Sequence, residues 1–300
     1  MKPFRSFLSF IFLTNEKSRL RAGWRILIAG FLTALFFNVV DWARRALSLA
    51  GPTSLLISLG IDLFVVTSAI YLTRRLIDRR TFTSLGFALN RRAGLDILLG
   101  ILITCVLIGA IYLIELSAGW LRSTSFAWQT EAPSMVMYQT LRYFVIYILV
   151  AWNEELVYRG YILQSLASGF NLRWGILISS LYFGMEHLSN PNSTWMAAAG
   201  IFVLALLFAY AYVRTGQLWL PIGMHLGWNF FQSTVFGFPV SGHDRPSLFH
   251  ITVSGPEVWT GGAFGPEAGL VILPICVLGA IMIYQFTKNR GRSDIPDSSA

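Results

Sequence analysis

The sequence predicts an all-α protein, a polytopic bundle of about eight transmembrane helices, and three observations carry this prediction. First, 55% of the 300 residues are hydrophobic and only 13% are charged. Soluble proteins carry about 25% charged residues, so most of this surface is expected to contact lipid. Second, apolar runs of the length of a membrane helix recur along the chain, and third, Lys and Arg collect between alternate pairs of these runs. This composition excludes an ordinary soluble enzyme.

The predicted elements follow the apolar runs in order. Segment 1–23 has a basic start and a short apolar stretch without a small-residue cleavage site, so it is expected at the cytoplasmic membrane interface. The other expected parts are N-terminal transmembrane helices, core helices, an extracytoplasmic loop with the last helix, and a polar tail, at 24–132, 133–236, 237–287 and 288–300. The eight predicted spans are 24–40, 54–73, 95–116, 136–166, 172–188, 195–213, 216–236 and 267–286.

Basic residues set the predicted orientation, because Lys and Arg collect in short cytoplasmic loops. Two basic clusters, within 1–25 and 74–92, are therefore placed inside, as is the tail. Both termini are predicted to be cytoplasmic, in a bacterial cytoplasmic membrane or alternatively in the endoplasmic reticulum. Contact of these basic residues with acidic membrane lipids is enough to explain the net charge of +8, so membrane lipids are the expected partners and no nucleic acid is expected. Cys105 and Cys276 lie in apolar runs, so neither a disulfide framework nor a thiolate metal site is expected.

The first polar motif inside an apolar helix is AWNEELVYRG at 151–160. A carboxylate in lipid is costly unless it is paired or hydrated, so such a residue is a functional candidate. Glu155 and Arg159 are four residues apart on one helix face and can form an ion pair, whereas Glu154 points about 100° away. Glu154 is therefore the free carboxylate, suited to accept a proton from water. Taken alone, the Glu155 and Arg159 pair is expected to be structural.

Two later helices carry matching chemistry in FGMEH at 183–187 and HLGWN at 225–229. His225 and Asn229 share one helix face and can direct donors to one point, which is an oxyanion-hole arrangement. Glu154 with His187 would activate water, and the combination describes amide hydrolysis. Each histidine alone could equally be a packing residue, and Phe183 is expected to pack.

One geometric requirement follows from the loop count. Glu154 should lie toward the cytoplasmic half of its helix, whereas His187 should lie toward the far end of the next helix. Their depths agree if the fourth helix is long, from about 134 to 167, and tilted, if the fifth begins later, or if the number of spans differs.

The three motifs resemble those of the CPBP family of intramembrane proteases, the CAAX-protease, bacteriocin-processing and abortive-infection group, over about residues 140–232. The resemblance implies an endopeptidase in which Glu154 is the catalytic glutamate, His187 its partner in activating water, and His225 and Asn229 the oxyanion donors. Glu155 and Arg159 complete the first motif in a supporting role. The substrate is expected to be a peptide or protein, lipidated or unmodified.

Several alternatives stay open at the level of the sequence. Glu154, His187 and His225 could supply three ligands to a divalent metal such as zinc, although no HExxH helix is present. His243 and His250 are expected to be incidental loop residues. A noncatalytic scaffold or an immunity-type peptide-binding protein would use the same cavity without chemistry. A proton-coupled transporter would also contain intramembrane acids and histidines.

Overall fold

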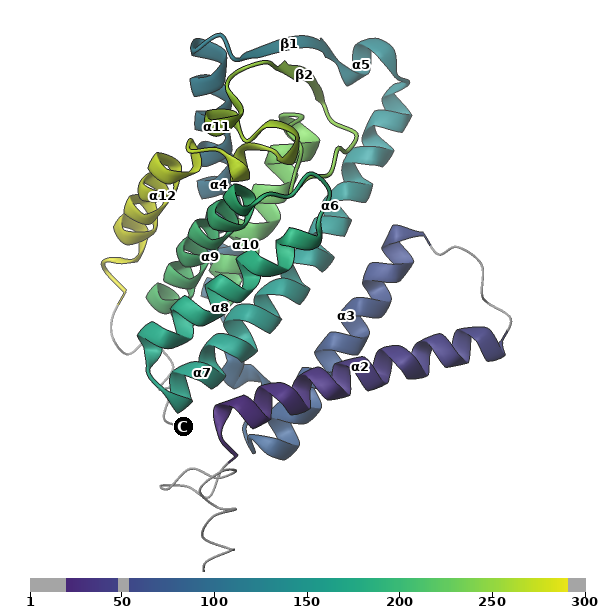
Figure 1. Cartoon of the computed structure of the whole chain (residues 1–300), viewed down its shortest axis with the longest axis vertical. Coiled ribbons are helices and arrows are strands. Elements are labelled where there is room, and N and C mark those ends of the chain that lie inside the picture. The colour runs from purple at the N-terminus through teal and green to yellow at the C-terminus, as the bar shows by residue number, and fades with distance from the viewer. Residues whose placement is uncertain (1–19, 48–53, 291–300) are drawn as a thin grey trace, which may run out of the picture.

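The computed structural model describes residues 20–47 and 54–290, and it confirms the predicted all-α bundle (Figure 1). Most of the predicted segments 1–23 and 288–300 lies outside the described residues. Within the described ranges, five helices are long and apolar enough to cross a membrane. They are α2 (Ala22–Ala46), α3 (Leu55–Leu72) with its π-helical extension to Ile77, α4 (Arg91–Ser117), the continuous helix Pro133–Gly169, and α9 (Trp195–Thr215).

The three remaining predicted spans are helical but shorter than the sequence suggested. They are α8 (Leu172–Glu186), α10 (Trp219–Asn229) with a π-helical continuation to Val235, and α12 (Ile272–Thr287). At 1.5 Å per residue, the 15 residues of α8 extend about 22 Å, less than the roughly 30 Å of a bilayer core. The count of about eight spans therefore exceeds the number of helices that meet the length requirement.

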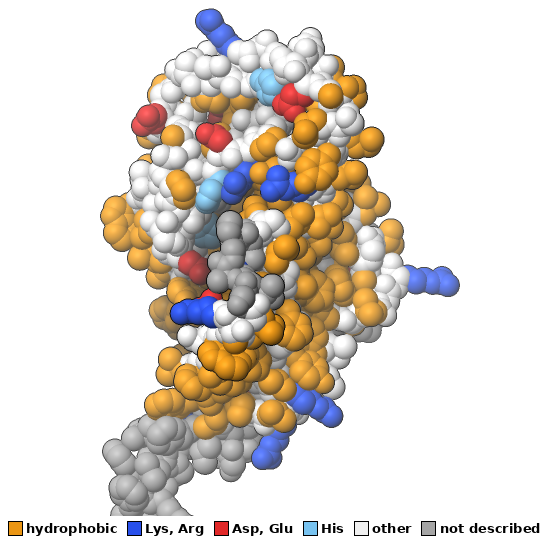
Figure 2. All heavy atoms as spheres, turned by 90° about the vertical axis from the view of Figure 1, so that its right-hand side faces the viewer, with side chains coloured by type: hydrophobic (Ala, Val, Ile, Leu, Met, Phe, Trp, Pro, Cys, Tyr) orange, Lys and Arg blue, Asp and Glu red, His pale blue; other side chains and the backbone are white. Residues whose placement is uncertain are grey.

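The outer surface of the bundle is apolar. Large hydrophobic side chains stand exposed on several helices, including Phe31 at 67%, Trp42 at 71%, Leu95 at 64% and Leu113 at 63%. Figure 2 shows hydrophobic side chains over much of the middle and lower part of one face. Because a soluble protein seldom exposes continuous apolar surface on this scale, these side chains are suited to contact lipid.

The longest helix combines α6 (Pro133–Glu155), a π-helical segment (Leu156–Leu163) and α7 (Gln164–Gly169), and it runs down the bundle in Figure 1. A fourth helix from about 134 to 167 was one of the three arrangements that would bring Glu154 and His187 to one depth, and the observed helix has nearly these bounds. Glu155 ends the regular α-helical part, directly before the π-helical segment. Single π-helical turns often occur at functional sites, because the wider turn changes the direction in which later side chains project.

Helix α10 packs closely against α4 because glycine removes side chains from the contact. A methyl group at Gly223 would lie 2.3 Å from the carbonyl oxygen of Ile97, and one at Gly227 would lie 2.2 Å from Oγ1 of Thr104. Small residues permit such close helix contacts in membrane proteins. His225 lies two residues from each glycine, about 200° around the helix, so its side chain projects away from α4.

A two-stranded antiparallel sheet, which was not predicted, joins two loops at one end of the bundle (Figure 1). Strand β1 (Leu121–Phe126) follows α4, and β2 (Phe249–Val253) lies in the loop before α12. The register pairs Leu121 with Val253 and Phe126 with Phe249. Short helices α5 (Ala127–Thr130) and α11 (Glu257–Thr260) flank these strands. The sheet fixes the long loop 237–263 against the rest of the molecule.

Candidate active site

Glu155 is the fully buried centre of the candidate site. Its Oε1 accepts a hydrogen bond from Nη1 of Arg159 at 2.8 Å, across one turn of helix. The same oxygen lies 2.8 Å from Nδ1 of His225, which belongs to α10. A carboxylate can only accept, so Nδ1 of His225 carries a proton and donates it to this bond. Glu155 therefore fixes the ring of a histidine 70 positions away in the sequence.

Arg159 extends this arrangement to two more helices. Its guanidinium lies over the rings of Phe183 in α8 and Phe208 in α9, at 4.7 Å and 5.4 Å from their centroids. Its Nη2 donates to the backbone oxygen of Ala205 at 3.2 Å. A buried guanidinium with one carboxylate and two aromatic faces has partners on several sides, which offsets its cost of burial. Phe183 packs in this position, as the sequence suggested.

Glu154 faces a different direction from Glu155. Its Oε2 lies 3.6 Å from Nε2 of His225, and its side chain is 32% exposed, whereas that of Glu155 is fully buried. Among the described residues, Oε2 of Glu154 has no hydrogen-bond partner although the atom itself is buried. An unsatisfied carboxylate oxygen is costly in a buried setting, and a water molecule or a substrate N–H group would satisfy it.

His187 lies at the end of α8, where the helix tightens into a short 3₁₀ turn (His187–Ser189). Its Nδ1 is 2.8 Å from the backbone oxygen of Phe183. Because a carbonyl oxygen cannot donate, Nδ1 carries the proton of the neutral ring and Nε2 keeps a free electron pair. In this tautomer, Nε2 can accept a hydrogen bond from water.

One cavity of about 230 Å³ brings four predicted site residues together. Glu154 comes from α6, His187 from the turn after α8, and both His225 and Asn229 from α10. A neighbouring cavity of about 310 Å³ is also lined by Glu154 and His187. Further polar residues of these two cavities were not assigned a role in the site from the sequence, among them Asn153, Glu186, Asn190, Ser241, His243 and Arg245.

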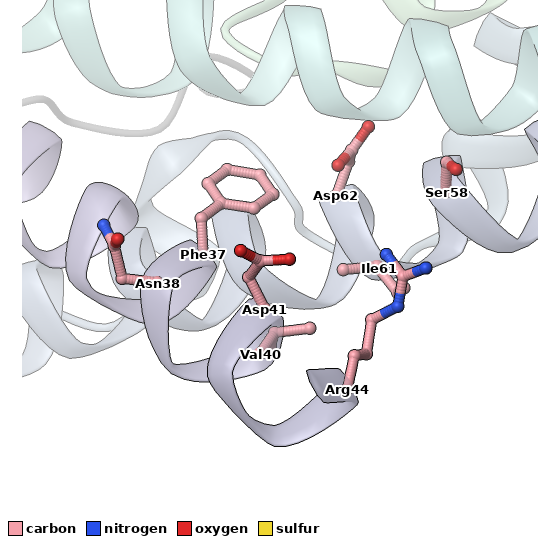
Figure 3. Close-up of a pocket in the computed structure, with 8 residues that line it drawn as sticks. All are labelled: Phe37, Asn38, Val40, Asp41, Arg44, Ser58, Ile61 and Asp62. Atoms are coloured by element: carbon pink, nitrogen blue, oxygen red, sulfur yellow. The ribbon is translucent and has the colours of Figure 1, made fainter. Parts of the chain in front are cut away.

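Larger cavities lie elsewhere, but they lack this chemistry. The cavity in Figure 3, of about 370 Å³, lies between α2 and α3, and its polar groups include Asp41 and Asp62. It contains none of the residues of the three motifs. An adjacent apolar cavity of about 600 Å³ is lined by side chains such as Phe64. The choice of the smaller cavity rests on its carboxylate and two histidines, which can perform acid and base chemistry.

Glu267 is a second buried acid beside the site, and its role was not predicted from the sequence. It lies in the loop before α12, where Oε1 accepts from Nε1 of Trp228 at 3.1 Å and Oε2 accepts from the backbone N–H of Ser241 at 2.6 Å. Burial raises the pKa of its carboxyl, and these hydrogen bonds partly oppose the rise. Its sequence signal is an acid at the start of the apolar run 267–286.

The candidate residues do not match a three-ligand metal site. Within residues 20–47 and 54–290, no group of three His, Cys, Asp or Glu side chains is arranged to hold a metal ion. His225 directs Nδ1 to Glu155 and Nε2 toward Glu154, and His187 has only Nε2 free. This arrangement supports no step through zinc.

The fold and the cavity define a class: an integral membrane protein with a buried carboxylate and histidine site between its helices. Residues 136–231, which contain all three motifs, match the family described as type II CAAX prenyl endopeptidase Rce1-like. This match confirms the resemblance to the CAAX-protease group that the motifs indicated, and it places that resemblance on about the segment expected.

Two curated relatives match a similar fraction of the chain. The "Uncharacterized 24.3 kDa protein" of Escherichia coli is 34% identical over 83 residues, 27% of this chain and 37% of that protein. The "Putative membrane peptidase YdiL" of Bacillus subtilis (strain 168) is 35% identical over 78 residues, 26% of this chain and 30% of that protein. The chain thus spans about a third of the length of these relatives. No solved structure matches it.

Proposed function

We propose that the protein is an intramembrane endopeptidase of the CAAX-protease type, which hydrolyses a peptide bond in the cavity around Glu154. The observation that carries the proposal is that one cavity is lined by Glu154, His187, His225 and Asn229, which come from three separate helical regions. The match of residues 136–231 to an endopeptidase family supports the same reaction class.

The first step activates water. The carboxylate of Glu154 accepts a proton from a water molecule that His187 orients through Nε2, and the water oxygen attacks the carbonyl carbon of the scissile bond. The tautomer of His187, fixed by the backbone oxygen of Phe183, leaves Nε2 free for this contact.

The second step stabilises the oxyanion. The side-chain amide of Asn229 donates to the developing negative oxygen, and Nε2 of His225 does so when the ring is an imidazolium. Glu155 accepts from Nδ1 and so supports the imidazolium and its orientation. Collapse of the tetrahedral intermediate breaks the C–N bond. The proton held by Glu154 passes to the leaving amine, and the products are a carboxylic acid and an amine.

The experiment uses purified wild-type protein and the Glu154→Gln variant, each incubated with a pool of lipidated and unmodified peptides, with and without a chelator. Products are identified by mass spectrometry. We expect cleavage by the wild type and none by Glu154→Gln. The control is Glu115→Gln, which changes a buried acid that lies outside both site cavities. Cleavage by Glu154→Gln would remove this carboxylate from the mechanism.

The same experiment also tests the role of a metal, the kind of peptide that is cleaved and the noncatalytic alternative. Loss of cleavage with chelator would support zinc on the site residues despite their arrangement. A preference for lipidated peptides would define the substrate class. Peptide binding without cleavage by either protein would support the noncatalytic scaffold or immunity function.

We also propose that the protein lies in a bacterial cytoplasmic membrane with both termini in the cytoplasm. The basic residues of segments 1–25 and 74–92 support this orientation. The relatives from Escherichia coli and Bacillus subtilis agree with a bacterial source. A reporter that is active only in the cytoplasm, fused to either terminus, should be active, and an inactive fusion at either end would contradict this topology.

A further inference from the structure

A loop outside the family-matched segment forms one wall of the catalytic cavity. We name residues 238–245 the roof loop; it follows the π-helical end of α10. Of its residues, Val240, Ser241, His243 and Arg245 line the same cavity as Glu154. The family match ends at residue 231, so these side chains lie outside the segment that matches the family.

The roof loop is held at several points. The backbone N–H and hydroxyl of Ser241 donate to Oε2 of Glu267 at 2.6 Å and 3.3 Å. The backbone oxygen of Ser241 accepts from Nδ2 of Asn190 at 3.1 Å, and that of Pro239 accepts from Nε2 of Gln232 at 2.6 Å. These contacts fix the loop before a ligand binds, which lowers the entropic cost of using its side chains for recognition.

The roof loop brings positive charge to a cavity that Glu154 also lines. Arg245 is partly buried, and its described contact is with the ring of Tyr143, at 6.0 Å from the centroid. In the described part of the chain, Arg245 forms no salt bridge, whereas the buried Arg25, Arg74 and Arg159 each pair with a carboxylate. A guanidinium that lines a cavity without a carboxylate partner is suited to bind one from a ligand.

His243 adds a second nitrogen to this wall. Its Nδ1 lies 3.1 Å from the backbone oxygen of Ser241, so Nδ1 is the donor of that bond, and Nε2 donates to a carboxylate when the ring is an imidazolium. The lining of the cavity therefore contains both an acidic and a basic side chain. Glu154 repels an anionic group, whereas Arg245 attracts one, as does His243 when its ring is an imidazolium, and this difference orients a ligand that carries a single carboxylate.

We propose that Arg245, with His243, binds a carboxylate of the peptide substrate and so selects peptides with a free carboxylate close to the scissile bond. The proposal rests on the proposed peptidase function. Two sources supply this chemistry, the C-terminal carboxylate of a peptide and the side chain of Asp or Glu. Arg245 is a specificity residue in this arrangement, and Glu267 positions the loop that carries it.

The kinetic test starts from a peptide that the wild-type protein cleaves. It is prepared with a free C-terminus, with a C-terminal amide, and as the amide with one Glu placed near the scissile bond. We expect kcat/KM to fall roughly ten- to a hundredfold when the recognised carboxylate is removed, mainly through KM. Arg245→Gln should abolish this preference, and Arg245→Lys should restore part of it. The matched control is Arg122→Gln, at an exposed position of β1.

A binding test separates failure of this proposal from failure of the peptidase function. Short fluorescein-labelled peptides of Leu and Ala, in the same three forms, are titrated into Glu154→Gln and into Glu154→Gln combined with Arg245→Gln. Tighter binding of one carboxylate form, lost with Arg245→Gln, would support the subsite even if no peptide is cut. The proposal would be overturned if all three peptide forms bind equally, or if none binds. It would also be overturned if Arg245→Gln keeps the preference of the wild type for peptides with a carboxylate.

Discussion

Oε1 of Glu155 lies 2.8 Å from Nδ1 of His225, and this contact joins the first and the third motif across two helices. The same oxygen accepts from Arg159, so one atom of a fully buried carboxylate orients both a neighbour in its own helix and a ring in α10. The two adjacent acids thus differ in environment. Glu155 is committed to positioning, and Glu154 is left to face the cavity.

Removing the cation of the buried pair should destabilise the protein strongly. We expect Arg159→Met to lower the free energy of unfolding by about 3–5 kcal/mol, because it leaves the carboxylate of Glu155 buried without its cation. Denaturant unfolding in detergent measures this change. Arg45→Met is the control, since Arg45 and Asp41 have the same spacing on an exposed helix surface, and no measurable loss is expected there. Equal losses in both variants would contradict the role of burial.

Asn229 should act on the rate and not on binding. If its amide donates to the oxyanion, Asn229→Ala should lower kcat by about 10²- to 10³-fold and leave KM nearly unchanged. Steady-state kinetics on a cleaved peptide measures both constants. Asn38→Ala, at an exposed position of α2, should leave both unchanged. A rise in KM with unchanged kcat would instead assign Asn229 to substrate binding.

The glycine contact between α10 and α4 predicts a large effect from one methyl group. Gly223→Ala places a Cβ atom 2.3 Å from the carbonyl oxygen of Ile97, so we expect a loss of about 1–3 kcal/mol in unfolding free energy and a misplaced His225. Thermal unfolding and activity per folded molecule test both effects. Gly94→Ala in α4 meets nothing within 4 Å and should be neutral or stabilising by about 0.5–1 kcal/mol.

Glu267 should make stability depend on pH. Burial raises its pKa above the ordinary 4.5, so the folded protein binds this proton more tightly than the unfolded chain does. The free energy of unfolding should therefore fall as pH rises from about 4.5 through the raised pKa, and then level off. Thermal unfolding at a series of pH values measures the slope. Glu267→Gln should flatten this dependence of stability on pH, whereas substitution of the exposed Glu257 by Gln should not. If the slope is unchanged in Glu267→Gln, the pH dependence comes from other groups.

The sequence predicted the parts of the site that depend on local spacing. The pairing of Glu155 with Arg159 follows from helical periodicity, and the mismatch in depth between Glu154 and His187 suggested a long fourth helix as one of three solutions. Hydropathy predicted about eight spans, whereas five helices in the described ranges meet the length requirement, because an apolar run such as that of α8 forms a helix of only 15 residues.

What the sequence did not reveal depends on contacts between distant segments. The β1 and β2 strands have no hairpin signal, since about 120 residues separate them. Glu267 reaches the site only through Trp228 and Ser241, and no local pattern encodes that contact. His243, expected to be an incidental loop residue, lines the cavity together with Glu154, which lies about 90 positions earlier in the sequence.

The close fit of α10 to α4 has a consequence for any attempt to transfer this site to another protein. The segment 136–231 contains every motif residue, but it does not contain α4. Without that partner, the hydrogen-only surface at Gly223 and Gly227 would face lipid, and α10 would be free to rotate about its axis. The direction in which His225 and Asn229 project is thus set by α4, a helix that contributes no residue to the chemistry. A site transferred to another protein would need α4 as well as the matched segment.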